Sequence, residues 1–350
     1  MQLNSSLEAI GENRLIAAFL RALSRRPDQH NRPHEADAEL IPLPGGEQLL
    51  ALTVDTVAEE IALGFYRDPE TVGWMAAMVS LSDLAAVGAT PLGLLVSATL
   101  PQEAAAGWQA GVARGLEAAC RAAGTYVLGG DTNFGAQPSV TTAAAGVVAR
   151  ERVLLRTGCR PGDRLYATGR LGGGGPVAAR ALWSLPEALV AGEFRPRARL
   201  AAGQALAGLA TACMDSSDGL IATLDQLGRL NGVGFELTTP LAELLDPAAL
   251  RLSEALGLDP LLMLAQPHGE FELLFTLEAA RELPEEISAR SGGAPLLLGR
   301  LVPEPGVIRL AGERPRVVDG ARIRNLLDEV GGDLPRYTEE LMRLVQEAAG

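Results

Sequence analysis

Lysine is absent from this sequence of 350 residues, so all 30 of its basic residues are arginines. A Walker-type phosphate loop requires a lysine, as do Schiff-base mechanisms and enzymes that use a lysine as the nucleophile. The missing lysine therefore excludes these three kinds of catalytic site.

Cysteine and histidine are scarce, with three residues of each. The cysteines are Cys120, Cys159 and Cys213, and no two of them form a CxxC pair. This spacing argues against a zinc site made of cysteine and histidine, and against a framework of disulfides. Scattered thiols of this kind are typical of buried side chains in a reducing compartment.

Basic charge and long apolar runs are also lacking. The chain carries 43 acidic residues against 30 basic ones, a formal net charge of −13. Proteins that bind nucleic acid or an anionic membrane normally present a basic face, so we expect neither partner. The N-terminus lacks a basic start followed by an apolar segment, and no run of 18 apolar residues occurs. We therefore expect a soluble, cytoplasmic protein without a signal peptide.

The apolar content and the length bound the fold. Hydrophobic residues make up 47% of the chain, and 350 residues suggest two domains, each with its own core. Periodicity predicts strands at 48–55, 92–100, 126–128, 139–149 and 164–168, with helices over 7–23, 72–87 and 104–123. The turn-rich segment 156–163 (RTGCRPGD) is typical of a hinge. We predict an α/β (α+β) chain with an N-terminal domain over residues 1–150, a C-terminal α/β domain over residues 151–335 and a C-terminal helix over residues 336–350.

Five aspartates interrupt apolar segments or follow them directly. These are Asp55, Asp83, Asp131, Asp215 and Asp218. A buried carboxylate needs a cation, a hydrogen-bond donor or solvent. Local explanations compete for most of them, because Asp215 could cap a helix and Asp131 could close a turn. Asp83 has no such local role, since it lies inside an otherwise apolar helical stretch.

Taken together, these carboxylates favour a magnesium site. Mg²⁺ prefers oxygen ligands, and it is usually bound together with the phosphates of a nucleotide. Two glycines precede Asp131, and their backbone amides could approach such phosphates closely. Arg156, in the hinge, could hold an ATP phosphate through two hydrogen bonds. The residues thus indicate a magnesium-dependent enzyme that uses a nucleotide and has no Walker-type phosphate loop.

Specific motifs make the pattern recognisable as a family. LTVDTVAEE, MVSLSDLAAVGATP, LGGDT, LLRTGCRPGD, MDSSDGL and GEFELLF follow one another across residues 52–275, after an opening GENRLIAAF. The chain resembles the thiamine-monophosphate kinases of the aminoimidazole-ribonucleotide-synthetase-like (AIR-synthetase-like) superfamily. The resemblance implies a two-domain AIR-synthetase-like fold, a homodimer whose N-terminal domains share a β-barrel, and ATP bound between the domains. The implied reaction is Mg²⁺-dependent phosphoryl transfer from ATP to thiamine monophosphate, giving thiamine diphosphate for thiamine biosynthesis.

The same resemblance implies roles for individual residues. Magnesium ligands would be Asp37, Asp55, Asp83, Asp131, Asp215 and Asp218, with Thr53 beside the metals. ATP would be contacted by Gly130, Asp131, Arg156 and Ser217. Asp55 and Asp218 are the residues expected to act in catalysis, and Glu270 and Glu272 are the candidates for contact with the substrate.

The sequence departs from the family pattern mainly on the substrate side. Ala36 replaces the first of two paired aspartates, and Ala62 stands where the family pattern DTLVEGVHF has a substrate-contacting histidine. A C-terminal GxDHF-like segment is absent. Two alternatives to a divergent thiamine-monophosphate kinase follow: a kinase for another small molecule, such as the alcohol α-ribazole, or a nucleotide-binding paralogue without turnover. A solvated face is the favoured interpretation of Glu59 and Glu60, and a surface position that of His268.

Overall fold

The computed structural model describes residues 11–101, 106–186, 194–312 and 315–348, and it confirms the mixed α/β class. The elements up to residue 149 are α1 (Gly11–Ala22), β1 (Glu39–Pro42), β2 (Gln48–Thr56), α2 (Ala58–Ala62), α3 (Pro69–Ala86), β3 (Thr90–Leu100), α4 (Ala106–Ala123), β4 (Val127–Phe134) and β5 (Ser139–Ala149). Next come β6 (Arg164–Ala167), α5 (Gly175–Leu182), α6 (Leu200–Leu206), β7 (Ala212–Asp215), α7 (Leu220–Asn231), β8 (Gly234–Leu237), α8 (Leu241–Leu244) and α9 (Pro247–Leu256). The last are α10 (Leu261–Leu264), β9 (Leu273–Leu277), α11 (Glu285–Ser291), β10 (Leu296–Val302), β11 (Ile308–Leu310), β12 (Arg316–Val318), α12 (Gly320–Glu329) and α13 (Leu334–Ala348).

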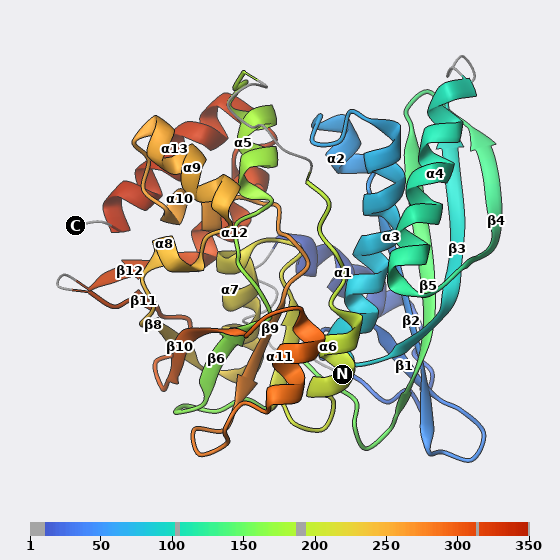
Figure 1. Ribbon diagram of the computed structural model, residues 1–350, viewed down its shortest axis with the longest axis horizontal. Coiled ribbons are helices and arrows are strands. Elements are labelled where there is room, and N and C mark those ends of the chain that lie inside the picture. The colour runs from blue at the N-terminus through green and yellow to red at the C-terminus, as the bar shows by residue number, and fades with distance from the viewer. Residues whose placement is uncertain (1–10, 102–105, 187–193, 313–314, 349–350) are drawn as a thin grey trace.

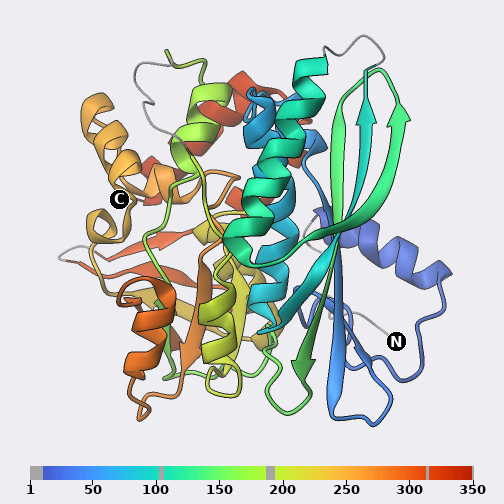
Figure 2. The ribbon, with the colours of Figure 1, turned by 45° about the vertical axis from the view of Figure 1, so that its right-hand side comes forward.

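These strands form two sheets that lie side by side (Figure 1). The first sheet has the order β1-β2-β5-β3-β4, with antiparallel pairs except for the parallel pair β3–β4. The second has the order β12-β11-β8-β10-β6-β9-β7, in which only β11 and β8 are parallel among the described strands. Helices α3 and α4 cover one face of the first sheet and separate it from the second (Figures 1 and 2).

Helix α3 occupies the centre of the molecule. Its first turn is fixed by Asp68, whose carboxylate accepts a hydrogen bond of 2.8 Å from the backbone N–H of Thr71, and by Pro69 at the first helical position. The helix is apolar on all sides, which is the pattern of a helix buried all round. It contacts β2 and β5 on one side and α6 and β7 on the other, so its residues can reach groups from both sheets.

One expected turn proved to be a strand. Gly129, Gly130 and Asp131 were expected to follow a short strand, but they lie within β4, which continues to Phe134 at the edge of the first sheet. A Cβ atom at Gly130 would lie 1.8 Å from the carbonyl oxygen of Val96 in β3. The glycine is therefore required by the close approach of two strands.

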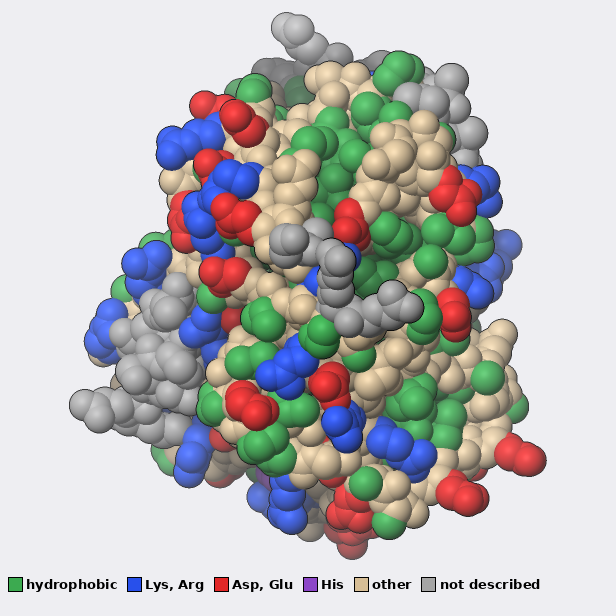
Figure 3. Space-filling view, turned by 90° about the vertical axis from the view of Figure 1, so that its left-hand side faces the viewer, with side chains coloured by type: hydrophobic (Ala, Val, Ile, Leu, Met, Phe, Trp, Pro, Cys, Tyr) green, Lys and Arg blue, Asp and Glu red, His purple; other side chains and the backbone are tan. Residues whose placement is uncertain are grey.

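The two ends of the described chain are helical, as predicted. Helix α1 begins at Gly11, and the earlier part of the predicted helix lies outside the described residues. Helix α13 matches the predicted C-terminal helix and buries one face, through Tyr337, Leu341, Leu344 and others. None of the described helices is long and apolar enough to span a membrane. On the face drawn in Figure 3, acidic and basic side chains are interspersed.

Candidate functional site

Three aspartates from three distant elements converge beside α3. Asp37 precedes β1, Asp83 lies in the last turns of α3, and Asp215 ends β7. One carboxylate oxygen of each lies within 4.8 Å of the others. The side chains of Asp37 and Asp215 are almost fully buried. We call these three residues the acid cluster.

Hydroxyl groups support the acid cluster from β2 and α3. The Thr53 hydroxyl lies 2.5 Å from Asp83 Oδ2 and 3.4 Å from Asp55 Oδ2, so it links the two carboxylates. The Ser82 hydroxyl donates to Asp215 Oδ2 at 2.6 Å. Asp55 thus belongs to the same site as the acid cluster, as the sequence predicts.

Arg156 supplies a positive charge at one end of the site. Its terminal nitrogen lies 2.8 Å from Asp37 Oδ1. The other oxygen, Asp37 Oδ2, is buried and has no hydrogen-bond partner among the described residues. A buried carboxylate oxygen without a donor, beside two further carboxylates, is a set of ligands that suits Mg²⁺. The residues present therefore fit this ion.

Burial and mutual repulsion raise the pKa values of the carboxyl groups. Burial, and then the negative charge of Asp37, raise the pKa of Asp215 to about 7. Burial, followed by the charges of Asp55 and Asp215, raises the pKa of Asp83 well above its usual value. The pKa of Asp55 is also raised, mainly by burial. Groups in this state favour a bound cation, which removes the cause of the shift.

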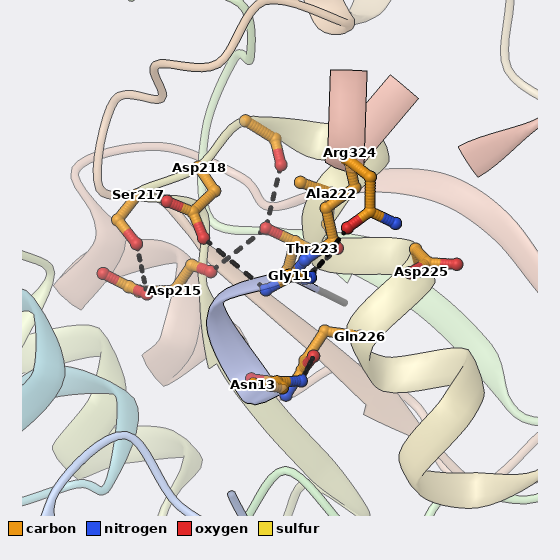
Figure 4. A network of polar contacts seen from close by, with 12 residues as sticks. Gly11, Asn13, Asp215, Ser217, Asp218, Ala222, Thr223, Asp225, Gln226 and Arg324 are labelled. Carbon is orange, nitrogen blue, oxygen red and sulfur yellow. Dashed lines mark hydrogen bonds and ion pairs between the residues drawn. The ribbon is translucent and has the colours of Figure 1, made fainter. Parts of the chain in front are cut away.

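The MDSSDG segment carries Asp215 of the acid cluster together with Ser217 and Asp218 (Figure 4). The Ser217 hydroxyl donates to Asp215 Oδ1 at 3.2 Å. Asp218 is exposed and lies 3.9 Å from a terminal nitrogen of Arg324 in α12. Neither Asp215 nor Ser217 caps α7, because Gly219 occupies the N-cap with a φ of 81°. The capping alternative for Asp215 is therefore wrong.

Gly130 and Asp131 are not brought to the acid cluster. In the first sheet, Asp131 pairs with Ser97 of β3, which pairs in turn with Thr141 of β5. Thr141 pairs with Thr56, the neighbour of Asp55. Three strand spacings, about 14 Å, thus separate this row from β2. Asp131 is exposed, and its carboxylate accepts from the Asn133 side chain at 2.7 Å.

The two candidate substrate acids are both buried and already have partners. Glu272 accepts from the Thr168 hydroxyl at 2.5 Å and forms a two-point ion pair with Arg199. Glu270 accepts from the Ser216 hydroxyl at 2.8 Å and from the backbone N–H of Gly173 at 2.9 Å. Burial raises the pKa of Glu270 to about 8. These contacts tie the GEFELLF segment to its neighbours.

Sequence reasoning missed a second group of residues, which surrounds His268. His268, expected at the surface, is buried, and its Nε2 lies 3.0 Å from the Tyr66 hydroxyl oxygen. The rings of Phe65, Tyr66 and Phe194 surround it at centroid distances of 5.4 to 5.6 Å. Glu60, expected on a solvated face, has a buried Oε2 without a hydrogen-bond partner among the described residues. The available signal in the sequence was the scarcity of aromatic residues, against which the adjacent pair Phe65-Tyr66 stands out.

The sequence and the fold are similar to those of known proteins. Residues 35–148 match the family described as AIR synthase related protein, N-terminal domain. The chain is 32% identical to the thiamine-monophosphate kinase of Halobacterium salinarum over 274 residues, which cover 75% of this chain and 88% of that protein. It is 33% identical to the thiamine-monophosphate kinase of Escherichia coli K12 over 278 residues, covering 77% and 83%. The solved structure of AaThiL complexed with AMPPCP and TMP shares the fold, with a TM-score of 0.71 and 23% identity over 90% of this chain and 96% of that one.

Proposed function

This chain belongs to the thiamine-monophosphate kinase family, and from that membership we propose that it phosphorylates thiamine monophosphate with ATP. In this reaction the bond between the γ-phosphorus and the β,γ-bridging oxygen of ATP breaks. A terminal phosphate oxygen of thiamine monophosphate forms the new bond, and ADP leaves. The observation that carries the proposal is the acid cluster, where Asp37, Asp83 and Asp215 meet within 4.8 Å.

The proposed roles of the side chains follow from their positions. Asp37, Asp83 and Asp215 would hold Mg²⁺, with Asp55 and Thr53 beside them and Asp218 in the MDSSDG segment. The metal, when bound, supplies positive charge against the phosphates of both substrates. Arg156 holds Asp37 through one terminal nitrogen, and its side chain keeps some exposure (17%), so it is the proposed donor to an ATP phosphate. AMPPCP, an analogue of ATP, occupies the solved AaThiL complex, which supports ATP as the co-substrate.

Asp131 and Gly130 need a different argument, because the acid cluster does not include them. We propose that they contact the nucleotide or its metal from the edge of the first sheet. Asp131 is exposed, and only its Oδ2 accepts a described side-chain hydrogen bond, from Asn133. Its carboxylate can therefore also contact a metal ion or a hydrogen-bond donor of the nucleotide. Ser217, half-buried beside Asp215, is the proposed contact to ATP on the opposite side.

A different acceptor is a second candidate, favoured by one observation. Glu270 and Glu272 both make internal contacts, so neither presents a free carboxylate for a substrate. Ala62 is exposed where the family pattern has a histidine. A small alcohol such as α-ribazole therefore belongs in any test of the acceptor.

Assembly and location are also proposals. We propose a homodimer formed through the first sheet, because Leu95, Tyr126, Leu128 and Phe134 expose more than half of their surface there.

The proposed domain boundary falls near residue 150, where the first sheet ends, and residues 336–350 lie mostly in α13. Three buried free cysteines are compatible with the reducing cytoplasm.

The deciding experiment measures ADP release with ATP and Mg²⁺ and compares three acceptor conditions. Thiamine monophosphate, α-ribazole and no acceptor are run in parallel, and the product is identified by mass. Formation of thiamine diphosphate at rates ordinary for an enzyme supports the proposal. Release of ADP only with the alcohol assigns the second function, and release in neither case refutes both.

A further inference from the structure

Glu270 lies in the segment between α10 and β9, and both of its carboxylate oxygens already accept hydrogen bonds. Oε1 accepts from the Ser216 hydroxyl at 2.8 Å, and Oε2 accepts from the backbone N–H of Gly173 at 2.9 Å. The residue is only 7% exposed. A substrate would have to displace one of these two donors to reach the carboxylate, so the role of Glu270 follows from what it holds inside the protein.

Ser216 is the residue after Asp215, and it is fully buried. Its hydroxyl donates to Glu270 and accepts from the backbone N–H of Glu272 at 3.1 Å. Its own N–H donates to the Glu272 carbonyl oxygen at 2.8 Å, just beyond the last pair of β7 and β9, Asp215 with Leu273. Of these three bonds, only the one to Glu270 joins two side chains. Glu270 thus fixes the direction in which the Ser216 hydroxyl points.

The backbones of the GEFELLF and MDSSDG segments also lie in direct contact. The Gly269 N–H donates to the Ser217 carbonyl oxygen at 2.8 Å, and a Cβ atom at Gly269 would lie 1.4 Å from the Ser216 carbonyl oxygen. Phe271 has a φ of 62°, a region that a large side chain rarely adopts. Such a conformation persists where the surrounding contacts determine the backbone. The two segments are therefore held together as one unit.

Asp215 depends on this unit for its place in the acid cluster. Its carboxylate accepts from the hydroxyls of Ser82 and Ser217, but the chain that carries it is fixed by Ser216. Mg²⁺ requires nearly ideal octahedral ligand positions, so a small displacement of one carboxylate weakens its binding. Glu270 lies outside the acid cluster, and its effect on a bound ion passes through Ser216.

We propose that Glu270 is a positioning residue, which acts through the Ser216 hydroxyl to hold Asp215 where the acid cluster binds Mg²⁺. The inference rests on the proposed function, because it assigns a task within the same site. It differs from the role that the family resemblance implies for Glu270, which is contact with the substrate. A substrate contact changes the KM for the acceptor when it is removed, whereas a positioning residue changes the affinity for the metal.

The test uses Ser216→Ala, Glu270→Ala, the double variant and the conservative Glu270→Gln. Ser253→Ala is the matched control, because Ser253 is also buried and its hydroxyl donates to the Ala249 carbonyl oxygen within α9. Mn²⁺ prefers the same oxygen ligands as Mg²⁺, and its binding is measured by electron paramagnetic resonance without nucleotide or acceptor. Thermal unfolding in a chelator verifies that each variant is folded. A variant that only loses stability keeps the Kd of the wild type, because binding is measured on the folded protein.

We expect Ser216→Ala and Glu270→Ala each to weaken Mn²⁺ binding roughly 10- to 100-fold, the range for groups that hold metal ligands in place. The double variant should bind no more weakly than either single one, because both substitutions remove the same contact. Glu270→Gln should keep most of the affinity, since its amide oxygen can still accept from the Ser216 hydroxyl. Ser253→Ala should match the wild type.

Three results overturn the inference: additive losses in the double variant, wild-type affinity in Ser216→Ala, or no binding of Mn²⁺ by the wild type. If Glu270→Ala does not fold, the comparison of Ser216→Ala with Ser253→Ala decides alone.

The kinase assay separates this inference from the proposed function. Ser216→Ala should leave the KM for thiamine monophosphate unchanged at saturating Mg²⁺. If the wild type forms thiamine diphosphate and Glu270→Gln raises the KM for the acceptor without weakening Mn²⁺ binding, the function stands and the inference fails. If Mn²⁺ binding depends on Ser216 and Glu270 as expected but no acceptor is phosphorylated, the positioning role stands and the proposed function fails.

Discussion

Replacing Asp83 by asparagine should make the metal-free protein more stable and the enzyme inactive. Asparagine keeps an oxygen that can accept the hydrogen bond from the Thr53 hydroxyl. It removes one of three carboxylates whose oxygens lie within 4.8 Å of one another. The substitution therefore separates the charge of Asp83 from its shape.

The magnitude follows from the spacing. Two unit charges 4.8 Å apart repel each other by about 3 kcal/mol at an effective dielectric constant of 20. Asp37 is partly neutralised by Arg156, so the charges of Asp55 and Asp215 contribute most of the repulsion on Asp83. We expect the free energy of unfolding of Asp83→Asn to rise by about 3 kcal/mol at pH 8 in a metal chelator. The gain should shrink as the pH falls toward 4, because the raised pKa keeps the Asp83 carboxyl neutral in the folded state and the unfolded carboxyl, with its ordinary pKa of 3.8, is becoming neutral as well.

Denaturant unfolding at pH 8 and pH 4, with chelator and with excess Mg²⁺, measures this gain. Mg²⁺ should stabilise the wild type more than the variant, because ligands that bind the folded state raise its stability. Phosphoryl transfer should fall at least roughly 100-fold in the variant. A variant that is no more stable than the wild type in chelator, or that keeps its Mg²⁺-dependent activity, would refute the assignment of Asp83 to a metal site.

Three further predictions concern other parts of the molecule. Burial lowers the pKa of His268 from 6.5 to about 4, so stability present above pH 6.5 is lost as the pH falls toward 4. The loss between pH 7 and pH 5 should be smaller by about 2 kcal/mol in His268→Gln, as urea unfolding at both pH values will show. Arg199→Ala should destabilise the fold by about 2 kcal/mol, because it leaves the buried Glu272 without its ion pair; an unchanged urea midpoint would contradict this. Light scattering should give the mass of a dimer, and Leu95→Asp should shift it toward a monomer; a monomeric wild type would remove the proposed interface.

The acid cluster shows which part of the site the residue pattern alone could predict. Asp83 stood out because a carboxylate inside an apolar helix has no local purpose, and Asp215 because it and Asp218 flank two serines at an expected helix start. Asp37 lies in a polar loop, where an acid attracts no attention, and only the resemblance to a family pointed to it. The meeting of all three depends on α3 lying between the two sheets, which is a tertiary property.

The errors have physical causes as well. The predicted strand stopped at Leu128, before Gly129-Gly130, and closing a turn was one interpretation of Asp131. The close approach of β3 and β4 requires a residue without a Cβ at Gly130, so the strand continues through the glycines. His268 was assigned to the surface because it lies in a polar loop. Its burial results from aromatic rings of the segment between α2 and α3 and of the segment before α6, which no local window contains.

The position of each group in the fold explains why the metal side matches the family while the acceptor side departs from it. Asp83 belongs to a helix that packs on both sheets, so any change there alters the centre of the molecule. Glu60 and Ala62 belong to α2, a helix of five residues none of which is fully buried, and a substitution there leaves both sheets intact. A charged residue can therefore be gained or lost in α2 by substitution without disturbing the acid cluster.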